Sequence, residues 1–204
     1  MKAWQSLFNG RMLAVLVTSI ASGFPLALTG STLQAWYTQD GVNLLTIGLL
    51  SLVGLPYLLK VVWAPLMDHY VPLSIGRRKS WIVLLQGCIL VVLLLLSWLS
   101  PSKMPQTVAI VAVVLAFFSA SQDIVVDAYR TDIALPHERG MAASWLAIGY
   151  RFAMLFSGAL ALVFANYIGW QLTYRLMAGF MLLLMLLSWL IPKEPEDTLQ
   201  PRSL

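Results

Sequence analysis

The sequence predicts an all-α membrane protein in which six helices cross a lipid bilayer. Of its 204 residues, 59% are hydrophobic and only 11% are charged, and the mean hydropathy is +0.80. Soluble domains are about 45–50% apolar and about 25% charged, so lipid must surround most of this chain. The apolar residues form runs long enough to span a bilayer, and no strand-like alternation recurs, which excludes a β-barrel.

Each predicted span is a mostly apolar stretch of about 20 residues, the length that a transmembrane helix needs. Polar residues or Pro and Gly separate the stretches, as at residues 39–41 and 100–103. The predicted spans cover about 12–37, 44–66, 81–99, 106–129, 141–165 and 171–191. The polar residues 192–204 then form the start of a cytoplasmic linker or a truncated tail.

The first two spans contain residues that weaken a helix at mid-membrane. In the first span, Gly23, Ala27, Gly30 and Gln34 are spaced by three or four residues and share one helical face. Close packing against another helix explains the small residues, and a polar cavity wall would explain Gln34. The second span is interrupted by Gly and Pro at residues 54–56, where neighbouring helices or water must satisfy the backbone.

The distribution of Lys and Arg predicts the orientation. One side holds nine of these residues: two near the N-terminus, three at residues 77–79, two at 130–139 and two after 191. The other side holds Lys103 alone. Because cytoplasmic segments carry the excess of positive charge, both termini are expected in the cytoplasm.

The end of the fourth span carries charges that are costly in lipid and are therefore candidates for function. Asp123 and Asp127 are four residues apart and share one helical face, flanked by Gln122 and Arg130. Burial and a second nearby carboxylate favour the neutral form of a carboxyl group, so either aspartate can carry a proton. Two structural alternatives stay open. Asp127, Arg130 and Asp132 can be solvated at the helix end, and Asp123 can belong to an ion pair that fixes helices together.

Three cations also lie inside predicted spans. Lys60 is near the inner end of the second span, and it either pairs with the acidic face or reaches the interface with its long side chain. Arg151 is deeper in the fifth span, which favours a buried ion pair or an anionic substrate group. Its neighbour Tyr150 offers a hydroxyl, although core packing explains that residue equally well. Arg175 is expected to reach the outer interface.

The segment after the second span combines an acidic residue with a basic cluster. Asp68 follows Pro65 by three residues, and Gly76 precedes Arg77 and Arg78. This pattern resembles the loop motif of the major facilitator superfamily, although Pro65 replaces the usual Gly and three extra residues precede Gly76. The resemblance implies a cytoplasmic gate in which charges pair in one state and part in the other. The residues that would form this gate are Asp68, Arg77, Arg78 and Arg130.

Further segments resemble the AmpG-type muropeptide permeases and extend the resemblance to all six spans. They are residues 21–29 and 32–36, 119–132, 139–140 and 149–151. Acetyl-CoA transporters share part of the fourth-span signature, but the first-span match favours the permeases. The family's members are proton-driven importers of N-acetylglucosaminyl-1,6-anhydro-N-acetylmuramyl peptides in the bacterial inner membrane. They serve peptidoglycan recycling and supply the signal for inducible β-lactamase expression, so the resemblance implies these roles.

The resemblance also implies that this chain is one half of a transporter. The family has twelve spans in two six-helix halves, each made of two three-helix inverted repeats, with the substrate between the halves. The chain then needs a C-terminal half, in the same or a separate chain, or a second copy of itself. The proton gradient supplies the energy, and no cofactor is expected. The residues expected to act are Asp123 and Asp127 in proton coupling, and Gln34, Lys60, Gln122, Tyr150 and Arg151 in contact with the muropeptide.

Other classes of protein fit the sequence less well. A non-transporting membrane scaffold needs only the six spans, and it would tolerate neutralisation of the acidic face. An enzyme is disfavoured because His69 and His137 both lie at predicted loops, so neither a metal site nor a Ser/His/Asp arrangement is expected. Nucleic acid is not an expected partner either, because the net charge of +4 is explained by membrane orientation.

Overall fold

The computed structural model describes residues 9–195, and all regular secondary structure in that range is helical. The elements, in chain order, are α2 (Gly10–Thr29), α3 (Ser31–Gln39), α4 (Leu44–Leu49), η1 (Leu50–Gly54), α5 (Leu55–Leu59), η2 (Lys60–Val62), α6 (Ala64–His69), α7 (Arg77–Leu96), α8 (Pro105–Ile133), α9 (Arg139–Leu155), η3 (Phe156–Leu160), α10 (Ala161–Ile168) and α11 (Trp170–Leu190). The predicted charges Lys2 and Arg202, and the predicted tail from residue 196 on, lie outside the described residues.

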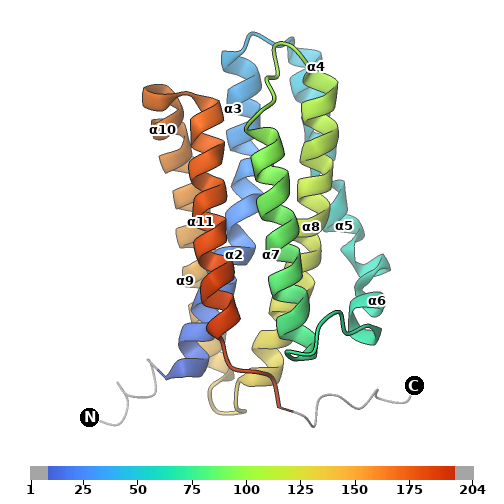
Figure 1. Cartoon of the computed structure of the whole chain (residues 1–204), viewed down its shortest axis with the longest axis vertical. Coiled ribbons are helices and arrows are strands. Elements are labelled where there is room, and N and C mark those ends of the chain that lie inside the picture. Colours follow the sequence, from blue (N-terminus) through green and yellow to red (C-terminus); the bar gives the residue numbers. More distant parts are fainter. Residues whose placement is uncertain (1–8, 196–204) are drawn as a thin grey trace.

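Within residues 9–195, six helical stretches are long and apolar enough to cross a membrane, which confirms the predicted number of spans. They cover Gly10–Gln39, Leu44–Val62, Arg77–Leu96, Pro105–Ile133, Arg139–Ile168 and Trp170–Leu190. The stretches alternate in direction, so α2 begins and α11 ends at the same end of the bundle (Figure 1). We call this the lower end; it also holds the turns after α6 and α8. The turns after α3, α7 and α10 form the upper end.

The central helix α2 contacts α8, α9 and α11, and it approaches α9 most closely. A Cβ on Gly23 of α2 would lie 2.9 Å from the carbonyl oxygen of Tyr150. A Cβ on Gly149 of α9 would lie 3.0 Å from the Cβ of Ser19. These distances are too short for a side chain, so the crossing depends on a glycine in each helix. The expected close packing of the first span is therefore confirmed at Gly23.

The buried apolar side chains form two clusters, stacked along the bundle. The upper cluster includes Phe24 and Leu115, and the lower cluster includes Val15 and Val126. Between the clusters, most buried side chains of α2 and α8 are polar. At the same boundary, Nε2 of Gln86 on α7 donates to Oγ of Ser188 on α11 at 2.9 Å. We call this boundary the polar layer; its members on α2 and α8 are Thr18, Ser19, Ser22, Ser119, Ser121, Gln122 and Asp123.

The second span is a chain of short helical pieces and is the least buried of the six. The predicted interruption at residues 54–56 is confirmed, because the 3-10 helix η1 ends at Gly54 and α5 begins one residue later with Pro56 in its first turn. In its most apolar window only 11% of the residues are buried, compared with 67% in the first span. Most of this span therefore faces away from the other described helices.

The residues after α11 pack against the lower end of the bundle. Nζ of Lys79 donates to the carbonyl oxygen of Ile191 at 2.8 Å, and Oη of Tyr129 donates to that of Pro192 at 2.8 Å. Glu194 is buried, and its Oε1 accepts a hydrogen bond of 2.7 Å from the backbone N–H of Arg78 at the beginning of α7. The polar composition of this segment predicts the end of α11 but not this docked position.

Candidate functional site

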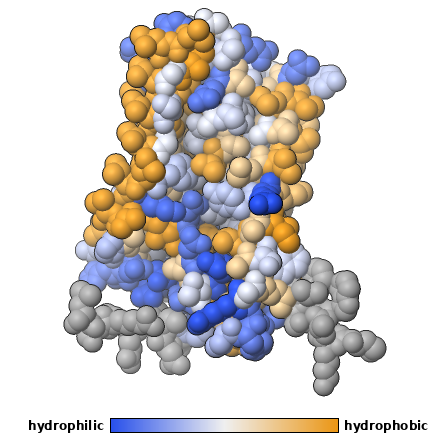
Figure 2. All heavy atoms as spheres, turned by 180° about the vertical axis from the view of Figure 1, so that it is seen from behind, coloured by the Kyte–Doolittle hydropathy of each residue, from blue (hydrophilic) through white to orange (hydrophobic). Residues whose placement is uncertain are grey.

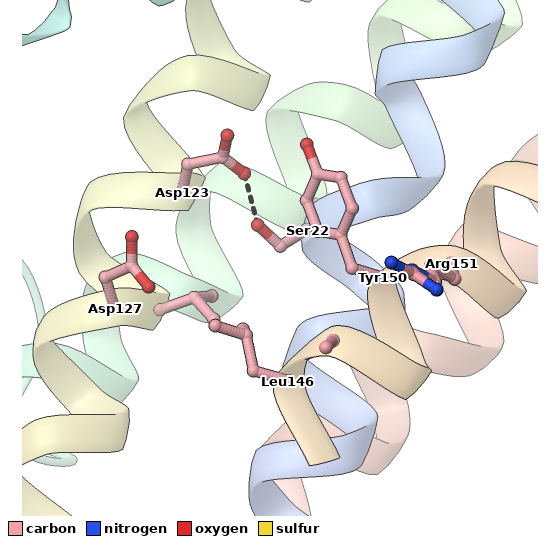
Figure 3. Close-up of a pocket in the computed structure, with 8 residues that line it drawn as sticks. Ser22, Asp123, Asp127, Leu146, Tyr150 and Arg151 are labelled. Carbon is pink, nitrogen blue, oxygen red and sulfur yellow. Dashed lines mark hydrogen bonds between the residues drawn. The ribbon is translucent and has the colours of Figure 1, made fainter. Parts of the chain in front are cut away.

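A cavity of about 250 Å³ opens at the polar layer between α2, α8 and α9. Its polar lining consists of Ser22, Asp123, Asp127, Tyr150 and Arg151, and three apolar side chains complete it. In Figure 3 the two aspartates of α8 face Ser22 and Tyr150. Figure 2 shows the molecule from behind, where hydrophilic atoms run down the middle between hydrophobic flanks and gather toward the lower end. The structure thus brings together four of the residues that the sequence analysis selected.

Asp123 is the more enclosed of the two carboxylates, with 9% of its surface exposed. Oγ of Ser22 donates a hydrogen bond to its Oδ1, and Nζ of Lys60 lies 3.8 Å from its Oδ2. Since Lys60 belongs to η2, this one carboxylate connects the first, second and fourth spans. The ion pair connects helices, as the structural alternative predicts. Its carboxylate also lies on a cavity wall, as the transport interpretation predicts.

Asp127 has a much more open environment, because 54% of its side chain is exposed. Its Oδ1 lies 3.6 Å from Nη2 of Arg130, one helical turn further along α8. An exposed pair of this kind contributes about 0–1 kcal/mol. The two carboxylates therefore share one cavity but differ in solvation, and of the two only Asp123 is held by other helices through the bonds described above.

Arg151 stands on the far side of Tyr150 from the two carboxylates (Figure 3). It is exposed, and it makes no ion pair with any residue between 9 and 195. The expected buried ion pair of Arg151 is therefore wrong. The other expectation for this residue, contact with an anionic substrate group, stays a prediction that its place on the cavity wall permits.

Three residues expected to contact the substrate do not line this cavity: Lys60, whose Nζ lies 3.8 Å from Oδ2 of Asp123, and the glutamines Gln122 and Gln34. Gln122 is fully buried beside Asp123, and its amide nitrogen and oxygen have no hydrogen-bond partner among the described residues. Gln34 lies on α3, closer to the upper end, and is half-buried. Neither residue lines this cavity. Gln122 does not line the cavity because adjacent residues on a helix point about 100° apart, and of Gln122 and Asp123 only Asp123 faces the opening.

Ser22 and Tyr57 belong to the site but were not selected from the sequence. Ser22 holds Asp123, and the hydroxyl of Tyr57 on α5 lies near Ser119 and Asp123. A signal for Ser22 exists, because Thr18 and Ser22 are four residues apart in an apolar span and share a face. Tyr57 carries no such signal, since an aromatic residue within an apolar run is typical of packing.

A second group of charges fixes the lower end of the bundle. Arg78 donates through Nη1 to Oδ1 of Asp68 and through Nε to Oδ2 of Asp132, the latter at 3.2 Å. Nη1 of Arg77 donates to the backbone carbonyl of Asp68 at 3.3 Å. Three of the four predicted gate residues thus lie together, whereas Arg130 pairs with Asp127 instead. We call Asp68, Arg78, Asp132 and Glu194 the lower-end network.

The loop motif itself is partly helical. The motif is expected in the connection after the second span, but Pro65 to His69 belong to α6 (Ala64–His69), and the turn lies between α6 and α7. Proline in the first turn explains why α6 can form there, because its missing N–H would have no intrahelical partner. His69 is consequently the last residue of a helix and not a loop residue.

Helices of membrane-spanning length beside a charged cavity at mid-height are an arrangement typical of membrane transporters. The chain belongs to the major facilitator superfamily, since the sequence model of that family matches residues 12–204. Within residues 9–195, no group of three or more His, Cys, Asp or Glu side chains could hold a metal ion.

The curated relatives are named as permeases or transporters where they carry a name. The chain is 46% identical over 190 residues to the anhydromuropeptide permease of Escherichia coli (strain K12), a match that covers 93% of this chain and 38% of that protein. It is 32% identical over 185 residues to the putative transporter AmpG 1 of Rickettsia conorii, covering 89% of this chain and 44% of that protein. The resemblance to AmpG-type permeases is confirmed, and the chain spans less than half the length of these relatives.

Proposed function

We propose that this chain is the N-terminal six-helix half of a proton-coupled importer of anhydromuropeptides. The transporter works by alternating access in the bacterial inner membrane. It returns N-acetylglucosaminyl-1,6-anhydro-N-acetylmuramyl peptides to the cytoplasm for peptidoglycan recycling, and by that route it supplies the signal for β-lactamase induction. The similarity to the anhydromuropeptide permease of Escherichia coli supports the choice of substrate.

The observation that carries the proposal is the position of Asp123. This carboxylate is nearly buried at mid-bundle, yet it lies on the wall of an open cavity and is held by a hydroxyl from α2 and an ammonium group from η2. A carboxyl group in such a place can gain or lose a proton and exchange its partners as it does so. Asp127, exposed in the same cavity, provides a second acidic group four residues away.

The distribution of charge and burial supports the proposed orientation and partner. The lower end holds most of the described Lys and Arg residues outside the membrane, and Lys103 stands at the upper end, so the lower end is cytoplasmic. The second and fifth spans have the least buried apolar windows, at 11% and 22%. We assign these two spans and the cavity to the side that meets the C-terminal half. The six helices then form two inverted repeats of three, and lipid covers the remaining apolar faces.

The cavity residues have chemistry that suits a muropeptide. Tyr150 can bond sugar hydroxyls, and the exposed guanidinium of Arg151 can pair with a peptide carboxylate in a bidentate manner. Lys60 becomes available to the substrate when Asp123 takes up a proton. Gln34 and Gln122 lie outside the cavity in this conformation, so any substrate contact by them requires the other state of the transport cycle.

The decisive experiment is the substitution Asp123→Asn in the full-length transporter. It should abolish muropeptide uptake driven by a proton gradient and leave membrane insertion intact, because the amide keeps the shape of the side chain but cannot exchange a proton. Asp40→Asn is the matched control, since Asp40 lies at the upper end, where Oδ2 accepts from Ser100 and Ser102. Uptake at the wild-type rate in Asp123→Asn would refute the assignment.

A further inference from the structure

Three polar side chains next to Asp123 lack the partners that buried groups require. Gln122 and Ser119 on α8 are fully buried, and neither the amide atoms of Gln122 nor Oγ of Ser119 has a hydrogen-bond partner among the described residues. The hydroxyl oxygen of Tyr57 on α5 is also buried without such a partner. Buried polar groups almost always bond to protein or to ordered water. Several unpartnered groups in one place therefore indicate a bound molecule.

The hydroxyl of Tyr57 on α5 lies close to Ser119 on α8 and Thr29 on α2. Ser119 precedes Gln122 by three residues and Asp123 by four, so the three side chains lie along neighbouring rows of one helix. The hydroxyl of Tyr57 faces Ser119 and Thr29 without forming a hydrogen bond of normal geometry to either. Thr29 uses its own proton to bond the carbonyl oxygen of Leu26 at 3.0 Å, so toward Tyr57 it could act only as an acceptor.

The chemistry of the region suits water better than other occupants. The amide of Gln122 offers two donors and an acceptor, and the hydroxyls of Ser119 and Tyr57 can each donate or accept. A buried water molecule makes about three hydrogen bonds of both kinds, whereas a cation would meet the amide nitrogen and the ammonium group of Lys60. Muropeptide is excluded by size, since Gln122 and Ser119 are fully buried and do not line the cavity.

We infer that Tyr57, Ser119 and Gln122 form a buried water-binding site on the upper side of Asp123. The helix α8 runs from the upper to the lower end, so Ser119 lies about 6 Å above Asp123 and Asp127 about 6 Å below it. Along α8, Asp123 thus lies between Ser119 of the water site and Asp127 of the open cavity. The role of the site rests on the proposed function: protons reach Asp123 from the upper side through this water and do not pass through the cavity.

X-ray radiolytic labelling of the full-length protein in nanodiscs tests the site without any substrate. Water close to a side chain generates hydroxyl radicals that oxidise it, and mass spectrometry then gives a rate for each residue. Tyr57 should be oxidised several-fold faster than Tyr174, which is fully buried and donates to the carbonyl oxygen of Leu28 at 3.1 Å. Equal rates at the two tyrosines would overturn the inference.

A substitution at Gln122 tests whether water bound at this site causes the oxidation of Tyr57. Gln122→Met keeps the volume but removes the bonding groups, so the oxidation of Tyr57 should fall several-fold. Gln86→Met is the matched control, because Gln86 is also buried in the polar layer but bonds directly to Ser188; it should leave the rate at Tyr57 unchanged. An unchanged rate in Gln122→Met would overturn the inference. Ser119→Ala, a smaller change, should lower the rate in the same direction and serves if Gln122→Met fails to fold.

A transport assay separates this inference from the proposed function. Ser119→Ala should slow proton-driven accumulation of muropeptide several-fold, while exchange of labelled for unlabelled muropeptide continues at the wild-type rate because the cavity is intact. Accumulation at the wild-type rate would overturn the proton route. A wild-type protein that transports no muropeptide would refute the proposed function, and the labelling rates would still decide whether the water site exists.

Discussion

The lower-end network and the cavity around Asp123 both contain buried charge, but they satisfy it differently. In the network, Arg78 bonds two carboxylates and donates its backbone N–H to a third, that of Glu194. At the cavity, Asp123 accepts from one hydroxyl and has an ammonium group at 3.8 Å, and neighbouring polar groups have no hydrogen-bond partner among residues 9–195. In the first region most of the charged groups bond to one another, although Oε2 of Glu194 has no hydrogen-bond partner among the described residues; in the second region more polar groups are left for mobile partners.

This difference indicates which helices are held in fixed positions and where bonding partners can change. The bonds of Arg78 hold neighbouring helices in fixed positions, because breaking them leaves a guanidinium that is only 9% exposed without its partners. Groups with incomplete bonding can exchange water, protons or solute at low cost. The network therefore fixes α6, α7, α8 and the segment after α11 relative to one another, and the cavity is the place where chemistry can change.

The largest effect on stability is expected from the network. Arg78→Ala should lower the free energy of unfolding by about 2–4 kcal/mol, because it leaves Asp132, only 19% exposed, without its cation. Thermal unfolding of the full-length protein in nanodiscs measures the loss. Arg175→Ala is the control, since Arg175 is exposed and forms no ion pair within residues 9–195. Equal stability of the two variants would contradict the view that the network holds the lower end together.

The next largest loss of stability is expected at the crossing of α2 and α9. A substitution there also tests whether helix packing shapes the cavity. Gly23→Ala places a methyl group 2.9 Å from the carbonyl oxygen of Tyr150, so the helices must separate. Overpacking of this kind costs about 1–3 kcal/mol. Gly87→Ala is a matched control, because a Cβ there would meet only the sulfur of Met185 at 3.7 Å. If Gly23→Ala were as stable as Gly87→Ala, the α2–α9 contact would not be a fixed wall.

The helices of this protein could be predicted because a segment that spans a lipid bilayer must be apolar over about 20 residues. Long apolar runs have no other stable form in a bilayer, and the count of spans follows. The acidic face was also predictable, since Asp123 and Asp127 are four residues apart. The partners of Asp123 from other helices were harder to predict, because the crossings of α2 and α5 with α8 place Ser22 and Tyr57 near it. The docking of Glu194 likewise depends on an N–H of α7 that lies more than a hundred residues away in the chain.

A smaller effect is expected where the segment after α11 meets the network. Glu194 accepts from the backbone N–H of Arg78 in the first turn of α7, so it acts as a helix cap from a distant segment. Glu194→Ala should cost about 1 kcal/mol, the usual contribution of a cap. Glu194→Gln keeps an oxygen acceptor and should cost less. Chemical denaturation of both variants measures the difference, and a greater loss in Glu194→Gln than in Glu194→Ala would show that the cap is not what matters.

The smallest change in stability is expected at Lys60, although its effect on uptake should be large. The nitrogen of Lys60 is 3.8 Å from Asp123, at the long end of ion-pair distances, and its side chain is 31% exposed, so the ion pair itself contributes little to stability. In Lys60→Met the buried carboxyl group can take up a proton instead of remaining charged and unpaired, which limits the cost further. Proton-driven uptake should nevertheless fall to a small fraction of the wild-type rate, because Asp123 no longer has a cation that competes with the proton. Lys103→Met at the upper end is the control and should change neither quantity. If Lys60→Met were as destabilising as Arg78→Ala, the pair would be a structural tie like the network, and the distinction between a fixed end and a changeable cavity would fail.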